Sequence, residues 1–180
     1  RGKVITLWNA ADGSRRAELA GHTSRVTSLD FSPDGSTLAS GGRDMEVLVW
    51  SMATGAEIQR LKGHGAAIWC VKFAPNGKYL ASSSSDLSIR LWDTTTWTTA
   101  RSYRGHLRQV DCMAFSPDSR ILYSGDDMGV LKQWNLDAPR TISDHWTLKG
   151  HTGSITNVEY SPDGTLLATS AGDWQSNDDT

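Results

Sequence analysis

The sequence has only two cysteines and no long apolar run. Two cysteines are too few for a disulfide-dense secreted scaffold or for a zinc module built from several thiolates. A membrane-spanning helix needs about 20 consecutive apolar residues, and no run here approaches that length. No basic stretch followed by an apolar core opens the sequence, so no secretory signal is visible and we expect a cytoplasmic location.

Neither sign of charge dominates. The 18 basic and 20 acidic side chains leave a formal net charge of −2, so electrostatics give no reason to expect a specific nucleic acid or an anionic membrane as partner. The apolar content of 38% is low, but the chain carries eight tryptophans. Because disordered chains are poor in aromatic residues, we expect a folded domain.

An internal repeat organises the residues that are present. Its markers are a tryptophan, a Gly-His pair and a turn tetrapeptide such as Ser32-Pro33-Asp34-Gly35, which begins ten residues after the histidine. All three keep one register over almost the whole chain, which chance does not produce. The tryptophans, spaced by 42 residues, are Trp8, Trp50, Trp92 and Trp134, and the Gly-His pairs, at steps of 42, 42 and 45, are 21–22, 63–64, 105–106 and 150–151.

Each period is typical of four short strands. In the first full period, alternating or apolar segments occupy 26–31, 37–40, 47–50 and 57–61, with Gly, Pro and Asp turn residues between them. No helical period lasts for more than a turn. A single sheet of this size cannot bury both of its faces, whereas radially stacked sheets can. The sequence therefore predicts an all-β protein, a β-propeller of four-stranded antiparallel blades.

The Gly-His pair, the Ser-Pro-Asp-Gly turn and the literal Trp92-Asp93 pair resemble the WD40 (G-beta) repeat family. The resemblance implies three complete repeats, at 21–62, 63–104 and 105–149. Residues 1–20 would be the last two strands of one blade, 150–173 the first two strands of another, and 174–180 a polar tail or truncated loop. The regular period is also similar to long bacterial WD40 arrays.

Members of this family typically close with about seven blades. The sequence is therefore interpreted as a fragment of a larger propeller. Two alternatives stay open: the half blades could combine within one chain to give four blades, or between two chains to give eight. Open blade edges would favour self-association.

The resemblance also implies a buried hydrogen-bond relay of His, Ser or Thr, Asp and Trp in each repeat. In the third repeat the Asp position holds Met128, preceded by Asp126 and Asp127, so this relay is expected to be rearranged or incomplete. In the fourth, the Trp position holds Asp179. The relay residues by repeat are His22, Ser40, Asp44 and Trp50; His64, Ser82, Asp86 and Trp92; His106, Ser124 and Trp134; and His151, Thr169 and Asp173.

Recurring His, Ser and Asp also suggest a hydrolase triad or a metal site. A triad is one local constellation, whereas this set recurs at fixed offsets, which favours a structural role. The four motif histidines fall in separate blades without a cysteine or carboxylate cluster, so neither a metal nor another cofactor is expected. Cys70 and Cys112 are 42 residues apart and are interpreted as small buried side chains, with a disulfide as the alternative.

Propellers of this family mainly bind protein or peptide partners on the face around the central channel, called the top face. The resemblance implies a non-catalytic interaction scaffold; the alternatives are a regulatory or sensor part of a multidomain enzyme such as a kinase, or a propeller enzyme. Trp69 beside two arginines is the sharpest candidate contact. The residues implied for this face are Arg25, Thr27, Arg43, Ala67, Trp69, Ser85, Gln109, Asp111, Asp126, Ser154 and Thr156.

Overall fold

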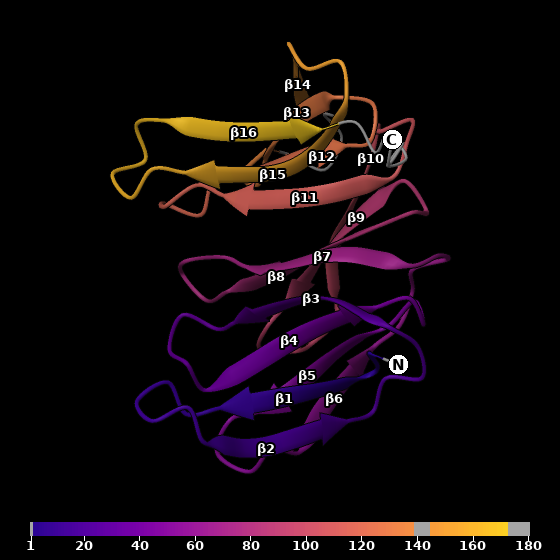
Figure 1. Ribbon diagram of the computed structural model, residues 1–180. Coiled ribbons are helices and arrows are strands. Elements are labelled where there is room, and N and C mark those ends of the chain that lie inside the picture. Colours follow the sequence, from indigo (N-terminus) through magenta and orange to yellow (C-terminus); the bar gives the residue numbers. More distant parts are fainter. Residues whose placement is uncertain (1, 139–144, 173–180) are drawn as a thin grey trace, which may run out of the picture.

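A computed structural model of the chain describes residues 2–138 and 145–172. All the regular secondary structure in these residues is β-strand, arranged in antiparallel sheets. The sheets stack one after another in chain order, with the indigo N-terminal strands at one end of the stack and the yellow strands at the other (Figure 1). The predicted all-β fold with propeller blades is confirmed.

Three of the sheets have four strands, and we number them as blades. Within residues 2–138 and 145–172, two further sheets have two strands each, in agreement with the expected three complete and two partial blades. Blade 1 consists of β3 (Val26–Phe31), β4 (Thr37–Gly42), β5 (Val47–Ser51) and β6 (Glu57–Leu61); blade 2 of β7 (Ile68–Phe73), β8 (Tyr79–Ser84), β9 (Ser88–Asp93) and β10 (Thr99–Arg104); blade 3 of β11 (Val110–Phe115), β12 (Ile121–Asp126), β13 (Val130–Asn135) and β14 (His145–Lys149); and the two-stranded sheets of β1 (Val4–Trp8) with β2 (Arg15–Ala20) and β15 (Ser154–Tyr160) with β16 (Leu167–Gly172).

The Pro-Asp-Gly turn of blade 1 and its equivalents, Pro-Asn-Gly in blade 2 and Pro-Asp-Ser in blade 3, join the first two strands of each complete blade. In blade 1, Gly35 has φ +69° and its N–H donates to Ser32 O at 2.8 Å. The Ser32 hydroxyl donates to Asp34 Oδ1 at 2.6 Å, and such hydrogen bonds lower the pKa of Asp34 to about 2. A residue type that tolerates positive φ and a carboxylate that accepts local donors explain why this tetrapeptide recurs.

The first strands of successive blades lie side by side: β3 beside β7, β7 beside β11, and β11 beside β15. The side chains at this junction are matched in size. A Cβ atom on Gly41 would lie 2.5 Å from Ile68, and one on Gly125 would lie 2.7 Å from Ile155. The equivalent pair at the middle junction is Ser83 and Val110, both fully buried. The larger residue on one strand thus accompanies the shorter residue on the other, as dense packing requires.

Polar side chains also connect the first strands. Ser28 Oγ accepts from Val71 N at 3.1 Å, and Asp30 Oδ2 accepts from Phe73 N at 2.6 Å. Cys70 and Cys112 occupy the position of Ser28 one and two periods later, where both are buried free thiols. Burial raises the pKa of Cys70 to about 11 and that of Cys112 to about 12, so both stay protonated and unreactive at neutral pH.

Candidate functional site

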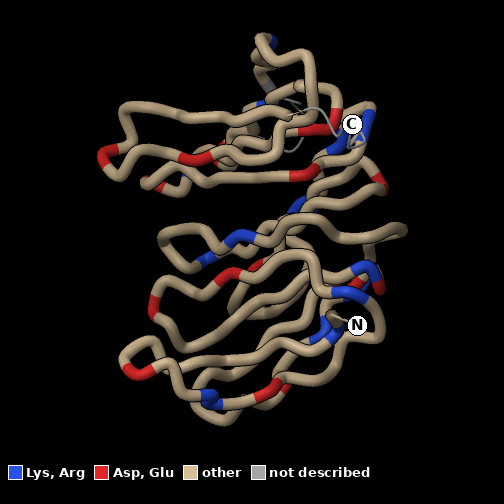
Figure 2. The backbone as a smooth tube through the Cα atoms, in the orientation of Figure 1, with Lys and Arg blue, Asp and Glu red and all other residues tan. Residues whose placement is uncertain are grey.

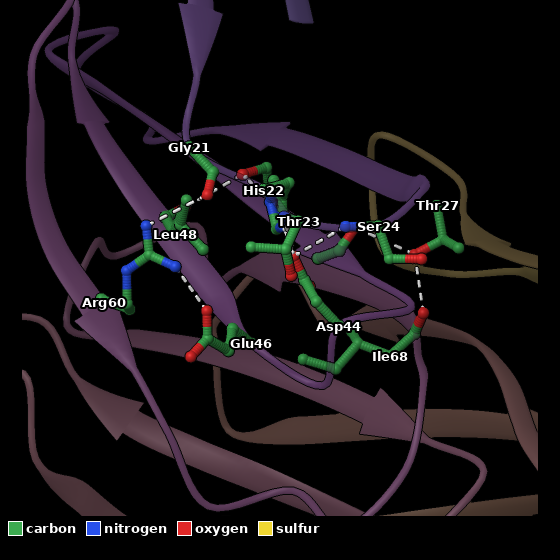
Figure 3. A network of polar contacts seen from close by, with 12 residues as sticks. Gly21, His22, Thr23, Ser24, Thr27, Asp44, Glu46, Leu48, Arg60 and Ile68 are labelled. Atoms are coloured by element: carbon green, nitrogen blue, oxygen red, sulfur yellow. Dashed lines mark hydrogen bonds and ion pairs between the residues drawn. The ribbon is translucent and has the colours of Figure 1, made fainter. Parts of the chain in front are cut away.

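The relay residues of blade 1 meet at the edge of the sheet opposite the Pro-Asp-Gly turns. Trp50 Nε1–H donates to Ser40 Oγ at 2.8 Å, and His22 Nε2 lies 2.8 Å from the same oxygen. His22 Nδ1 lies 2.8 Å from Asp44 Oδ2, which also accepts from Thr23 N (Figure 3). Strand β5 supplies the tryptophan, β4 the serine, and the loops on either side supply the histidine and the aspartate.

The donors and acceptors fix the direction of this chain. An indole N–H only donates and a carboxylate only accepts, whereas the serine hydroxyl and neutral imidazole do both. With the histidine proton on Nδ1, Trp50 donates to Ser40, Ser40 donates to His22, and His22 donates to Asp44. Every buried polar atom of the relay then has a partner, which stabilises the loops that it joins.

Blade 2 repeats the arrangement at the same offsets. His64 Nε2 is 2.8 Å from Ser82 Oγ and its Nδ1 is 2.9 Å from Asp86 Oδ2, while Trp92 donates to Ser82 at 2.9 Å. Burial lowers the pKa of His64, although the contact with Asp86 opposes this shift. Burial raises the pKa of Asp86, but hydrogen bonds from Ser88, Gly65 N and His64 outweigh it and hold that pKa well below its usual range. The pair is thus a neutral imidazole beside a carboxylate.

Blade 3 has the same contacts with a different acid. His106 Nδ1 lies 2.8 Å from Asp126 Oδ2, and His106 Nε2 lies 2.7 Å from Ser124 Oγ, to which Trp134 donates at 2.8 Å. Asp126 also accepts from Met128 N and Val130 N. This relay is rearranged, as the sequence allowed, but it is complete.

Asp126 therefore does not belong to the exposed face, and that prediction is wrong. Asp126 is only 2% exposed because its carboxylate is turned inward to His106. The exposed residue at this point is Asp127, whose N–H donates to Gln109 O, just as Arg43 N donates to Arg25 O and Ser85 N to Ala67 O. The 42-residue period relates Asp127 to Ser85 and could have identified it.

The blade 1 residue equivalent to Asp126 explains why the relay acid can come from a different position in blade 3. In blade 1 this position is Gly42, and a Cβ atom there would lie 2.5 Å from Asp44 Oδ1 and 2.7 Å from His22 Nδ1. A side chain at this position thus points into the space of the relay carboxylate. In blade 1, Gly42 leaves that space to the carboxylate of Asp44. In blade 3, Asp126 fills the space, so the position equivalent to Asp44 can hold Met128.

The two-stranded sheet β15–β16 holds part of a fourth relay. His151 Nε2 lies 2.7 Å from Thr169 Oγ1, and His151 is exposed. Asp173, the acid expected here, lies outside the described residues.

The relay offers little to a substrate. Ser40, Ser82 and Ser124 are fully buried, and each oxygen already accepts from a tryptophan and contacts a histidine. A hydrolytic nucleophile instead needs a free face toward the scissile bond. Within the ranges that the structure describes, no three His, Cys, Asp or Glu side chains gather where they could hold a metal ion. The described residues also include no helix long and apolar enough to cross a membrane.

A groove of about 520 Å³ opens at the top face, the edge of the blades on which the relay loops lie. It spans three blades and the β15–β16 sheet, so residues more than 100 positions apart in the sequence share it. All of its lining residues are among those implied for the top face. They are Arg25, Arg43, Trp69, Gln109, Asp111, Ser154 and Thr156.

A chain of hydrogen bonds runs along one side of the groove. Trp69 Nε1–H donates to Ser85 Oγ at 2.6 Å, and the Ser85 hydroxyl donates to Gln109 Oε1 at 2.6 Å. Gln109 Nε2 donates to Asp111 Oδ1 at 2.7 Å, and Ser154 Oγ donates to Asp111 Oδ2 at 3.1 Å. Burial raises the pKa of Asp111, and the two donors oppose this shift. The chain crosses two junctions between neighbouring sheets and holds the Trp69 ring in one orientation.

The remaining residues implied for the top face lie outside the lining. Thr27 Oγ1 donates to Ile68 O at 2.6 Å and so joins blades 1 and 2 (Figure 3). Ser85 supports Trp69 from behind, and Ala67 contributes its carbonyl to the Ser85 loop. These three positions are structural neighbours of the groove.

A family profile described as "WD domain, G-beta repeat" matches residues 13–51, 55–93, 97–135 and 143–178. These matches cover far more than half of the sequence. The chain belongs to the WD40 repeat family. The first three matches end at residues 51, 93 and 135, each one residue after the tryptophan of its repeat, in keeping with the 42-residue period.

One similar protein is "Small ribosomal subunit protein RACK1" of Caenorhabditis elegans, which is 38% identical to this chain over 47 residues. The matched segment covers 26% of this chain and 14% of the relative. The likeness is therefore about one repeat in extent, and it supports the family assignment without giving this chain the relative's role.

Proposed function

We propose that this chain is a non-catalytic WD40 interaction scaffold that binds a protein or peptide partner in the top-face groove. The observation that carries the proposal is the groove itself, which four sheets build together and which a fixed tryptophan lines. Tryptophan and arginine dominate the energetics of protein interfaces. Protein binding is also the usual role of the family to which the chain belongs.

The buried relays support the non-catalytic part of the proposal. Their histidines and serines have both partners that they need within each blade, so no activated group faces the groove. Basic and acidic residues are interspersed along the backbone of the stacked sheets (Figure 2), and this distribution favours a protein partner over nucleic acid or an anionic membrane. A cytoplasmic location stays a prediction.

The test is peptide selection on the full chain followed by substitution. Peptides enriched from a random display library would be titrated against the unmodified chain, Trp69→Ala and Trp146→Ala. Trp146 is a matched control because it is 72% exposed but lies on the outer strand β14. We expect Trp69→Ala to weaken binding by about 10-fold or more, as loss of an interface hot spot does, and Trp146→Ala to bind normally. Equal binding by both variants would overturn the proposal.

A further inference from the structure

The groove carries positive charge at one end that no described carboxylate neutralises. Arg25 and Arg43 are both exposed, and they are neighbours because Arg43 N–H donates to Arg25 O at 2.8 Å. Among the described residues, the arginines and lysines that pair with carboxylates are Arg15, Arg60, Lys62, Lys72 and Arg120. The guanidinium groups of two arginines that line the same groove are thus available to a ligand.

The acidic end of the groove differs because its carboxylate is already engaged. Both Asp111 oxygens accept hydrogen bonds from within the protein, one from Gln109 and one from Ser154. Ser154 is buried, and Asp111 is itself half-buried. The groove therefore presents two free cations at its blade 1 end and the hydrogen-bonded carboxylate of Asp111 at its blade 3 end, so the blade 1 end is the part that attracts negative charge.

Trp69 lies beside the cationic end and orients it. The guanidinium carbon of Arg43 lies 5.2 Å from the centre of the Trp69 ring. A guanidinium group stacked on an aromatic face keeps its edge donors free, and those donors match a carboxylate or a phosphoryl group in a two-point contact. The indole N–H is committed to Ser85, so Trp69 can offer a ligand only its apolar surface.

We propose that Arg25 and Arg43 form a subsite for an anionic side chain of the bound peptide, either a carboxylate or a phosphoryl ester. The residue next to that anion would pack on Trp69. The peptide would then cross from blade 1 toward blade 3, with its anionic residue at the blade 1 end. This inference rests on the proposed function of the groove and adds the chemistry of the ligand to it.

The test uses peptide pools in which one central residue is fixed and its neighbours are degenerate. The fixed residue is glutamate, phosphoserine, alanine or lysine, and binding of each fluorescent pool to the full chain is followed by anisotropy. We expect the glutamate or phosphoserine pool to bind about 5-fold or more tightly than the alanine pool, and the lysine pool to bind least. The tighter of the two anionic pools identifies the source of the negative charge.

Substitutions then locate the contact. Arg25→Gln and Arg43→Gln should each remove most of the preference for the anionic pool, because both side chains are exposed and the fold does not depend on them. Arg43→Lys keeps the charge but loses the planar contact, so it should retain only part of the preference. Arg120→Gln is the matched control: it removes an exposed arginine from the Pro-Asp-Ser turn at the opposite edge of blade 3.

The outcomes separate the two proposals. Anionic and alanine pools that bind equally, with binding still lost in Trp69→Ala, would overturn the anionic subsite and leave the groove as the binding site. An anionic preference that survives both arginine substitutions would also overturn it. Binding by no pool, or binding that Trp69→Ala leaves intact, would count against the groove as a partner site, and the subsite would fall with it.

Discussion

Blades 1 and 3 make the same histidine contact with acids from different sequence positions. In blade 1 the carboxylate comes from Asp44, at the fourth residue after Ser40, and in blade 3 it comes from Asp126, at the second residue after Ser124. The backbone of the turn is nevertheless unchanged: Met45 has φ 68° and its equivalent Gly129 has φ 75°. The repeat thus conserves a place for the carboxylate beside the histidine, and two backbone positions can each deliver a carboxylate there.

The largest effect should come from removing the acid of blade 3. Asp126→Ala leaves the Nδ1–H of buried His106 and two backbone N–H groups without their acceptor, and we expect a loss of about 3 kcal/mol in the free energy of unfolding. Urea denaturation measures it. Asp127→Ala, one residue along and exposed, should change stability by less than about 0.5 kcal/mol. Similar losses in both variants would mean that Asp126 is not the relay acid.

Converting blade 1 to the blade 3 arrangement sharpens the comparison further. Gly42→Asp alone puts a second carboxylate into the space held by Asp44, and we expect it to cost about 2–3 kcal/mol. Adding Asp44→Met should then recover more than half of that loss, because the new acid at 42 can bind His22 and the methionine can turn to solvent, as Met128 does. The same urea experiment reports both numbers. A double variant less stable than Gly42→Asp would show that the two positions are not interchangeable.

Removing the histidine tests whether the relay contributes equally to stability in a complete blade and in the two-stranded β15–β16 sheet. His64→Ala should cost about 1–3 kcal/mol in unfolding free energy, since it strands the hydroxyl of buried Ser82 and the Asp86 carboxylate. His151→Ala removes the equivalent residue from the β15–β16 sheet, where the histidine is exposed. Its cost should be below about 1 kcal/mol. Denaturation curves in which both substitutions cost the same would remove burial as the reason for the difference.

The pH dependence of stability should reflect that His64 is neutral in the folded chain. Burial lowers the folded-state pKa of His64, so as the pH falls below about 6.5, the usual histidine value, the unfolded chain takes up a proton that the folded chain does not. Stability due to this group is thus present above that pH and declines below it. Thermal denaturation from neutral to mildly acidic pH should show the decline, and a His64→Ala background should reduce its slope. An unchanged slope would contradict the assignment.

The carboxylates contribute in a lower pH range. The pKa values of Asp44, Asp86 and Asp126 are all held below the ordinary aspartate value in the folded state by hydrogen bonds that outweigh burial. Their stabilising contribution is present above the unfolded value, about 3.9, and is lost as the pH falls through the folded values. Acid unfolding should therefore follow the histidine-dependent decline as a separate step.

The sequence predicted the elements of the fold because each has a local cause. Turn residues such as Pro33 and Gly35 specify a reversal wherever they stand, and a fixed period places every reversal in the same part of a blade. The four-stranded sheets follow from these signals. The size match between Gly41 and Ile68 depends on two residues that meet only across a blade junction, and the period alone does not reveal such pairs.

The candidate site was predictable where position alone decides exposure. Arg25, Arg43 and Trp69 line the groove because their register places them on the loops of one edge. Asp126 was misplaced because adjacent aspartates at 126 and 127 are equal candidates in the sequence, and only the direction of the Cα–Cβ bond separates them. The chain of hydrogen bonds from Trp69 to Ser154 was also missed, since it joins side chains of blades 2 and 3 and the β15–β16 sheet.

The smallest expected change in stability is at Met128, the blade 3 position where blade 1 has its relay acid. Met128 occupies the place of the relay acid in the repeat, but its side chain is 57% exposed and makes no part of the His106 network. Met128→Ser should therefore change the free energy of unfolding by less than about 0.5 kcal/mol. The equivalent substitution in blade 2, Asp86→Ser, removes the acceptor of His64 and of Gly65 N and should cost about 2 kcal/mol. If urea denaturation gave equal values, the carboxylate's place in sequence, and not its place beside the histidine, would be what the repeat conserves.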